Sequence, residues 1–269
     1  MTAIHLHPSE LALLFSFAKV TEIVGWGDAP FQPGADGTGD MAAWYADGTA
    51  RLKAAGRLVE KADKTVTFVP SLTEATLALV DPALVMMAER KEGSEGLRRL
   101  TVHLSDDALV GLTRQADGMF ELTRYANLTA AAAACAAFLG TAPLPVTAGL
   151  KLETDMNNLR VMQTLADSGQ QETALARLID LGAPEAEAAS LLNAMTAPSA
   201  SGMLSLLYCA DNVARNAQAY RVMTHAESDT WITTALGSPQ GPMVIERSSI
   251  TALTGRIMVT VAARMQLAA

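Results

Sequence analysis

Apolar positions recur at helical spacing in three segments near the start of the chain, with glycine and proline breaks between them. Ser9 precedes the first segment as a good N-cap residue, and Pro70 opens the third. The stretch over 25–40 is dense in glycine, proline and aspartate, which predicts a loop. The pattern therefore predicts helices over 10–20, 41–61 and 70–81 and a short strand over 65–69.

Four segments of strand length follow, separated by Gly, Asp and Ser residues. In the second segment Leu100, Val102 and Leu104 alternate with Thr101 and His103. This alternation places one face on a core and the other toward water or a partner. We expect an antiparallel meander over 83–93, 97–107, 108–118 and 119–125, closed by an alanine-rich helix.

The second part of the chain shows a similar order of elements. Helical spacing recurs in three segments, and Gly182 and Pro184 separate the last two. Four strand-like segments and a final helix come next. We expect helices over 152–169, 171–183 and 184–198, strands over 202–212, 216–228, 229–238 and 242–249, and a helix that begins near residue 250.

The two closing helices share a start signal and an apolar stripe. Asn127 and Ser249 are the corresponding cap residues, each followed by an apolar residue and a threonine. The stripes have the same spacing and consist of Leu128, Ala131, Cys135 and Leu139 in one helix and Ile250, Leu253, Ile257 and Val261 in the other. Two α+β segments can agree in this way by chance, and that alternative stays open.

We therefore expect an α+β fold made of two similar helix-plus-antiparallel-meander halves. The halves would form a quasi-twofold arrangement with a central antiparallel sheet, which hides strand edges. The expected organisation is a first half over 1–140, a linker over 141–150 and a second half over 151–269.

Composition and charge exclude several classes of protein. Half of the 269 residues are apolar, which is enough for a substantial core. A net charge of −8, with both signs interspersed, argues against a nucleic-acid surface. The only thiols, Cys135 and Cys209, lie in apolar stretches and predict small buried hydrophobes. No secretory pattern and no membrane-length apolar run is visible, so we expect a cytoplasmic protein without membrane insertion and without a cofactor.

Two histidines beside acidic residues are the best candidates for chemistry. They are His103 with Asp106 and Asp107, and His225 with Glu227, and each group could supply an acid and a base. A histidine at a strand end near an acidic turn needs no chemical role, so a structural reading stays open. The motifs of serine hydrolases, zinc proteases, P-loop proteins and dinucleotide-binding proteins are absent from the sequence.

Three stretches carry a resemblance to a known family: PSLTEATLALVDPALVMMAER (70–90), LTVHLSDDALVGLTRQADGMFELTRY (100–125) and DTWITTALGSPQGPMVIERSSITALTGRI (229–257). In pattern and order they resemble the EspG family of type VII secretion chaperones. The resemblance implies an α+β protein of about this length with quasi-twofold internal symmetry. It also implies a non-enzymatic, cytosolic chaperone or adaptor that binds one end of an α-helical secretion substrate and keeps it soluble.

Such a chaperone needs a partly apolar surface that selects its partner, and no polarised catalytic group. The candidate partner-binding residues are Tyr220, Met223 and Trp231: Tyr220 and Trp231 flank the segment MTHAESD in the second meander, and Met223 lies between them. The alternative reading, in which they belong to the core of the sheet, stays open. The expected partner is an α-helical protein, and the sequence leaves a homodimer open.

Two other functional classes also stay open. One is an enzyme that acts on a small molecule in a pocket near the sheet. The other is a signalling or regulatory module, because residues 175–195 can be read as a helix-turn-helix. The second helix of that unit carries Glu185 and Glu187 and no lysine or arginine, which conflicts with contacts to phosphates and bases.

Overall fold

The computed structural model describes residues 3–34, 39–62, 65–93, 96–106, 108–141, 151–225, 230–235 and 241–268. These residues form an α+β fold with a large antiparallel sheet, as the sequence predicts. The chain divides into two compact units: unit 1 comprises Met1–Met87, Arg99–Ala131 and Leu206–Ala217, and unit 2 comprises Ala88–Arg98, Ala132–Ser205 and Gln218–Ala269. The expected halves over 1–140 and 151–269 stay a prediction, and nearly all of the expected linker lies outside the described residues.

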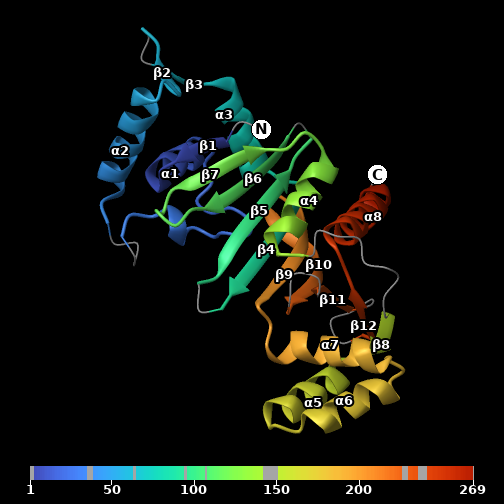
Figure 1. The fold of residues 1–269 in the computed structure, drawn as a ribbon. Helices are drawn as coiled ribbons and strands as arrows, with labels where there is room; N and C mark the ends of the chain where they lie inside the picture. The colour runs from blue at the N-terminus through green and yellow to red at the C-terminus, as the bar shows by residue number, and fades with distance from the viewer. Residues whose placement is uncertain are drawn as a thin grey trace. The chain divides into compact units, whose positions relative to one another are not determined.

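The first part of the chain supplies five strands of the sheet, in the order β1-β7-β6-β5-β4 (Figure 1). A separate two-stranded sheet is formed by β2 and β3. The elements are β1 (Ala3–Leu6), α1 (Pro8–Phe17), the 3-10 helix η1 (Ala29–Phe31), α2 (Met41–Ala54), β2 (Leu58–Glu60), β3 (Val66–Phe68), α3 (Pro70–Val80), β4 (Leu84–Glu92), β5 (Arg98–Leu104), β6 (Leu109–Arg114), β7 (Phe120–Arg124) and α4 (Leu128–Phe138).

Two helix ends in this part differ from the sequence-based expectation. The N-cap of α1 is His7 and not Ser9, because Pro8 takes the first helical position and the Glu10 side chain accepts the His7 backbone N–H at 2.6 Å. Helix α2 ends at Ala54, well before residue 61. Gly56 has a φ of 66°, a left-handed conformation that suits glycine and lets the chain turn into β2.

One face of β1, β7 and β6 packs against α1 and α3 and forms the core of unit 1. Leu6, Leu122 and Leu112 are buried on this face, and Leu122 pairs with Leu112 across the two strands. Leu11 of α1 and Leu79 of α3 are fully buried in the same cluster. The sheet and the two helices thus share a single apolar layer.

Thr101 and His103 lie on this core face, because they pair with Leu112 and Val110 of β6. Both have 0% exposure. The expectation that this side of the strand faces water or a partner is therefore wrong. The loop that carries Trp26 covers Thr101, so β5 is buried on both faces along most of its length.

The second part of the chain supplies five further strands, in the order β9-β10-β11-β12-β8. It repeats the earlier pattern, in which a short strand lies next to the last strand of a meander. The elements are β8 (Lys151–Thr154), α5 (Met156–Asp167), α6 (Gln171–Asp180), α7 (Glu185–Thr196), β9 (Ala200–Ala210), β10 (Val213–Thr224), β11 (Thr230–Ala235), β12 (Met243–Arg247) and α8 (Ile250–Ala268).

Helices α5, α6 and α7 form a layer whose core includes residues of the sheet in unit 2 (Figure 1). Met162, Leu178 and Leu191, one from each helix, are fully buried in this cluster together with Trp231 and Ile245 of the strands. Helix α7 is the member of the layer that contacts β11. The helical layer is thereby fixed to the sheet through α7.

The expected caps of the two closing helices are confirmed. The Asn127 side chain accepts the Ala130 N–H at 2.9 Å, and the Ser249 hydroxyl accepts the Ala252 N–H at 3.2 Å. Six of the eight stripe residues have an exposure of 1% or less: Ala131, Cys135, Leu139, Leu253, Ile257 and Val261. The two helices therefore follow one plan, while descent of both from a duplicated unit stays a prediction.

Candidate functional site

The three residues proposed from the sequence as partner contacts are all buried. Tyr220 is 2% exposed, Met223 is 3% exposed and Trp231 is fully buried. Tyr220 reaches α8, where its hydroxyl lies 2.7 Å from the Thr260 hydroxyl, and Met223 belongs to the core under α5, α6 and α7. In this structure the three side chains hold helices on the sheet, and a direct contact with a partner stays a prediction.

Trp231 is the centre of a polar cluster that joins β11 and β12 to α7. Its indole N–H donates to the Ser190 hydroxyl at 3.2 Å, and Arg247 donates to the same oxygen from Nη2 at 3.3 Å. Arg247 Nη1 also donates to Glu187 at 3.2 Å, and the guanidinium lies 5.5 Å from the centroid of the Trp231 ring. We call these four residues the Trp231 clamp. It attaches the helical layer to the sheet through charge-assisted and cation–π contacts.

Unit 1 contains a comparable cluster, the Trp26 clamp, formed by Trp26, Arg99, Thr101 and His103. The Trp26 indole N–H donates to Thr101 Oγ1 at 2.8 Å, and His103 Nε2 lies 2.9 Å from the same oxygen. The Arg99 guanidinium lies 5.3 Å from the centroid of the Trp26 ring and donates to the carbonyl of Gly25. The clamp ties the 25–34 loop to the buried face of β5.

His103 does not have the surroundings of an acid–base catalyst. Burial lowers the pKa of its imidazole to about 3, so the ring is neutral at pH 7. Its Nδ1 atom has no hydrogen-bond partner within the part of the chain that the structure describes. Asp106 is exposed in the turn that follows β5, and Asp107 lies outside the described residues.

The second histidine group cannot be assembled from the described residues. His225 Nδ1 lies 2.9 Å from the carbonyl oxygen of Ala197, at the end of α7, and Glu227 lies outside the described residues. Burial raises the pKa of Cys135 to about 12 and also raises that of Cys209, which keeps both thiols protonated.

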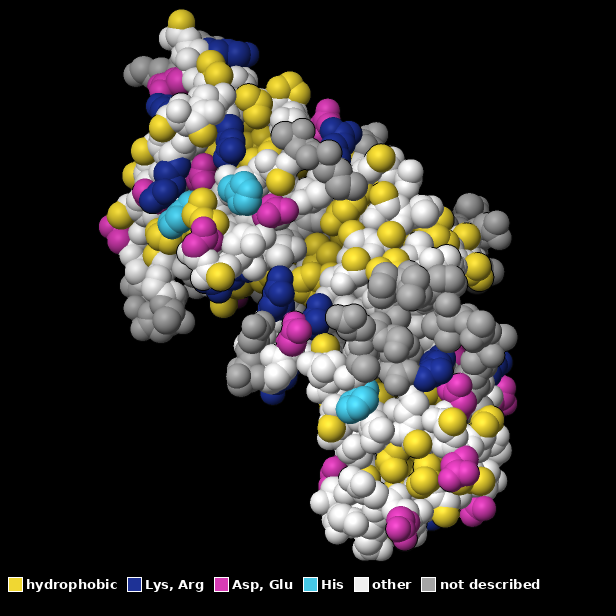
Figure 2. All heavy atoms as spheres, in the orientation of Figure 1, with side chains coloured by type: hydrophobic (Ala, Val, Ile, Leu, Met, Phe, Trp, Pro, Cys, Tyr) yellow, Lys and Arg dark blue, Asp and Glu magenta, His cyan; other side chains and the backbone are white. Residues whose placement is uncertain are grey.

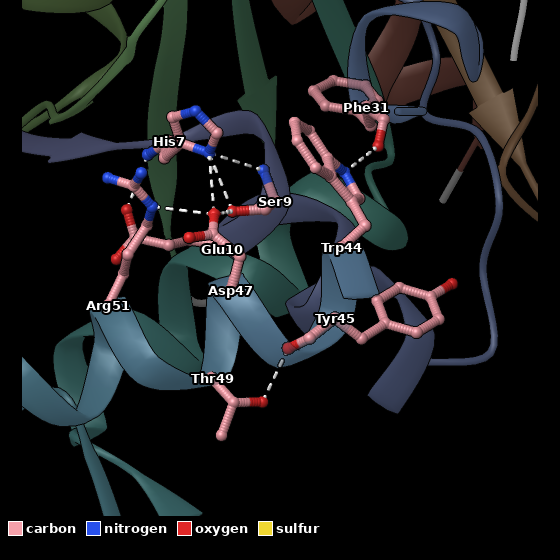
Figure 3. A network of polar contacts seen from close by, with 9 residues as sticks. All are labelled: His7, Ser9, Glu10, Phe31, Trp44, Tyr45, Asp47, Thr49 and Arg51. Carbon is pink, nitrogen blue, oxygen red and sulfur yellow. Dashed lines mark hydrogen bonds and ion pairs between the residues drawn. The ribbon is translucent and has the colours of Figure 1, made fainter. Parts of the chain in front are cut away.

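A polar network joins α1 to α2 and contains serine, histidine and aspartate (Figure 3). Ser9 Oγ donates to Asp47 Oδ2 at 2.7 Å and lies 2.7 Å from His7 Nδ1, while Arg51 Nε donates to the same Asp47 oxygen at 2.8 Å. A serine nucleophile needs histidine between serine and aspartate. Here serine lies in the middle and is fully buried, so the network serves as a helix-to-helix contact.

Close approach of the two helices explains this network. A Cβ atom on Gly48 would lie 2.3 Å from the carbonyl oxygen of Ser9, so only glycine fits at that point of α2. Hydrogen bonds from Ser9 and then from Arg51 hold the pKa of Asp47 below its usual range. Burial, with a smaller effect from Arg51, lowers the pKa of His7, so the contact forms between a carboxylate and a neutral imidazole.

A groove lies between α3 and the sheet in unit 1. It has a volume of about 570 Å³, and its floor includes Ile4 of β1, Val110 of β6 and Leu122 of β7. Ser71, Glu74 and Ala75 line it from α3, at spacings that place them on one side of the helix. The groove is therefore mainly apolar below and polar along its rim.

An ion pair joins the two sides of this groove. Arg124, the last residue of β7, pairs with Glu74 of α3, and the two side chains are 55% and 46% exposed. Sequence reasoning missed both residues, because an isolated glutamate on a helix and an arginine at a strand end carry no motif. The helical spacing of Ser71, Glu74 and Ala75 is the only signal in the sequence that relates to this site.

The described part of the chain contains neither a cluster of metal ligands nor a helix that could span a membrane. Among the described residues, no three His, Cys, Asp or Glu side chains gather as metal ligands. The described helices include none with the length and apolar character needed to cross a membrane. Figure 2 shows acidic and basic side chains interspersed on the face that it draws, in keeping with the charge pattern of the sequence.

The structure is similar to a solved secretion chaperone. The Mycobacterium tuberculosis type VII secretion system chaperone EspG5, solved in complex with a PE25–PPE41 dimer, matches with a TM-score of 0.67. The match covers 94% of this chain and 93% of that chain, at 11% sequence identity. At this identity the likeness is one of fold, and the resemblance to EspG-type chaperones that the sequence predicts is confirmed at that level.

Comparisons of sequence give no match. No protein-family model matches the chain. No curated protein matches it either.

Proposed function

We propose that this protein is a non-enzymatic, chaperone-like adaptor that binds a helical protein partner in the cytoplasm. The observation that carries the proposal is the fold likeness to EspG5, which extends over 94% of the chain and was found in a chaperone bound to a partner. A likeness that extends over 94% of this chain and 93% of that chain favours a similar function, namely binding of a protein partner. It does not name the partner, because a fold can serve several functions.

The burial of the reactive groups supports a binding role over a catalytic one. An acid–base residue needs contact with substrate and a pKa near the working pH. His103 has neither, since it is fully buried with a pKa of about 3, and Cys135 is fully buried with a pKa of about 12. The titratable groups with the largest shifts are thus parts of the interior.

The reading of residues 175–195 as a DNA-binding motif has less support. Helix α7, the would-be recognition helix, uses Glu187 and Ser190 to contact Arg247 and Trp231. Five residues of the helix are buried in the core of the layer: Ala188, Leu191, Leu192, Ala194 and Met195. A helix attached to a sheet in this way has few side chains left to enter a groove of DNA.

We place the partner surface on the layer formed by α5, α6 and α7. Met156 of α5 and Ile179 of α6 are 43% and 41% exposed, and Figure 2 shows apolar side chains at the surface of this layer. Exposed apolar side chains on rigid helices are suitable anchors for an amphipathic partner helix. The Trp231 clamp would act from beneath, by holding the layer in place.

The test is copurification of the full-length tagged chain from the organism that encodes it. We expect one predominantly helical protein in near-equal amount, identified by mass spectrometry and examined by circular dichroism. Met156→Glu and Ile179→Glu should each lower its recovery at least about tenfold, because a buried charge replaces an anchor. Val59→Glu, which changes a 52% exposed apolar residue of β2, is the matched control.

Two outcomes would contradict the proposal at different levels. Absence of any partner in near-equal amount would overturn the adaptor function. Equal recovery of a partner by the wild type and by both variants of the helical layer would overturn the proposed surface while leaving the function standing.

A further inference from the structure

We propose that the groove between α3 and the sheet of unit 1 binds an amphiphile with one acyl chain and a carboxylate head. The acyl chain would lie over Ile4, Val110 and Leu122, and the head would contact Arg124. This ligand site is separate from the partner surface proposed for the helical layer, and each can fail without the other.

The size and lining of the groove suit an acyl chain. A volume of about 570 Å³ lies within the range of small-molecule sites. Ala75 on α3 and Ala108 before β6 contribute only methyl groups, so the space between helix and sheet is left unfilled by the protein's own side chains. Val110 and Leu122 are only 1% and 2% exposed, so Ile4 and the rim residues supply most of the apolar surface that a hydrocarbon chain would remove from water.

The charges at the rim select the head group. Among the described residues that line the groove, Arg124 is the cation and Glu74 the anion. The Arg124 contact to Glu74 uses Nη1, and a guanidinium has five N–H donors arranged for planar acceptors. A second carboxylate can therefore bind Arg124 from the groove side while the existing pair is kept or exchanged.

The two rim residues are expected to have opposite effects on an anionic ligand. Arg124 attracts a carboxylate, whereas Glu74 repels it and competes for the same guanidinium. Removal of Glu74 should then strengthen binding, and removal of Arg124 should weaken it. A groove that binds hydrocarbon without regard to the head group would show no such asymmetry.

The experiment is isothermal titration of the full-length protein with sodium decanoate, decanol and decylamine. Decanoate should bind with saturation at one site and more tightly than decylamine. Octanoate should bind about fifteenfold more weakly than decanoate, because each buried CH₂ contributes about fourfold in affinity.

Variants separate the role of the head from that of the tail. Arg124→Gln should weaken decanoate at least about tenfold and change decanol less than about threefold, since one charge-assisted hydrogen bond is lost. Glu74→Gln should tighten decanoate severalfold. Arg215→Gln is the matched control, because Arg215 is a comparably exposed arginine paired with Asp211.

Filling the groove gives an independent readout. Ala75→Met, or Ala108→Met if the first variant unfolds, should abolish decanoate and decanol binding together while the circular dichroism spectrum stays unchanged. The proposal is overturned if decanoate shows no saturable binding, if Arg124→Gln weakens decanoate and decanol equally, or if both folded methionine variants bind decanoate as the wild type does. An equal affinity for decylamine would overturn the carboxylate head.

Discussion

The Trp26 and Trp231 clamps contain the same kinds of contact, but the tryptophan belongs to a loop in one clamp and to a strand of the sheet in the other. In each, an indole N–H donates to a hydroxyl that has a second polar neighbour, and an arginine lies over the ring. Trp26 reaches from a loop into the sheet, whereas Trp231 reaches from the sheet to helix α7. The loop clamp has a neutral, buried histidine as its second partner, and the helix clamp has an ion pair.

Similar contacts therefore hold a loop over a strand in one clamp and a helical layer on the sheet in the other. Trp26 is only partly buried, and it holds a loop over one strand. Trp231 is fully buried, and its contacts hold the helical layer that we propose as the partner surface. The contribution of each clamp to the free energy of unfolding should increase with the burial of its indole ring.

Truncation of the two tryptophans should give the largest contrast. Trp231→Ala should lower the free energy of unfolding by about 3–5 kcal/mol, because a fully buried aromatic leaves a cavity, and Trp26→Ala by about 1–3 kcal/mol. Urea unfolding followed by circular dichroism measures both. An equal loss in the two variants would contradict the proposed ranking.

Removal of the shared hydroxyls should have a smaller effect. Ser190→Ala and Thr101→Val should each cost about 1–3 kcal/mol, because each leaves an indole N–H without its acceptor inside the protein. Thr101→Val keeps the shape of the side chain, so its loss reports the hydrogen bonds. Thr251→Val, at an exposed position of α8, is a control for the loss of a hydroxyl as such.

Lowering the pH should destabilise the folded protein through His103 of the Trp26 clamp. The folded protein keeps this imidazole neutral, with a pKa of about 3, whereas the unfolded chain binds a proton below about 6.5. Stability is therefore lost as the pH falls from about 6.5 toward 3, by up to about 1.4 kcal/mol for each pH unit from this group. His103→Gln should reduce that slope, and an unchanged slope between pH 6.5 and 5 would refute the assignment.

Exchange of the stacked arginines should give the smallest change. Arg247→Lys and Arg99→Lys keep the positive charge but lose the planar contact with the indole ring, which is worth about 0.5–2 kcal/mol. We expect the larger loss for Arg247, because a lysine there cannot serve both Ser190 and Glu187 as a fork does. A chemical denaturation series on the two variants checks this order.

The meander strands and most helices could be predicted from the sequence. Strands β4 to β7 and β9 to β12 each coincide with an apolar segment that lies between glycine, aspartate, serine or proline breaks. Asn127 and Ser249 mark the starts of the closing helices, because their side chains cap them. These signals are local, so they are readable without knowledge of the fold.

The sheet edges and the surroundings of the candidate residues could not be predicted in the same way. β1 and β8 have four residues each, which is too short for an alternation to stand out. The orientation of Thr101 and His103 depends on a loop about 75 residues earlier, and the burial of Trp231 depends on α7. The pairing of Glu74 with Arg124 likewise joins distant segments, so no pattern along the chain reveals the groove.

The contact of Gly48 with Ser9 sets a genetic constraint. Any missense change of the glycine codon adds a Cβ atom, which would lie only 2.3 Å from the carbonyl oxygen of Ser9. Natural variants of this chain should therefore keep glycine at position 48 for as long as they keep helices α1 and α2 side by side. Where that codon has diverged, the serine, histidine and aspartate of the network should have diverged with it.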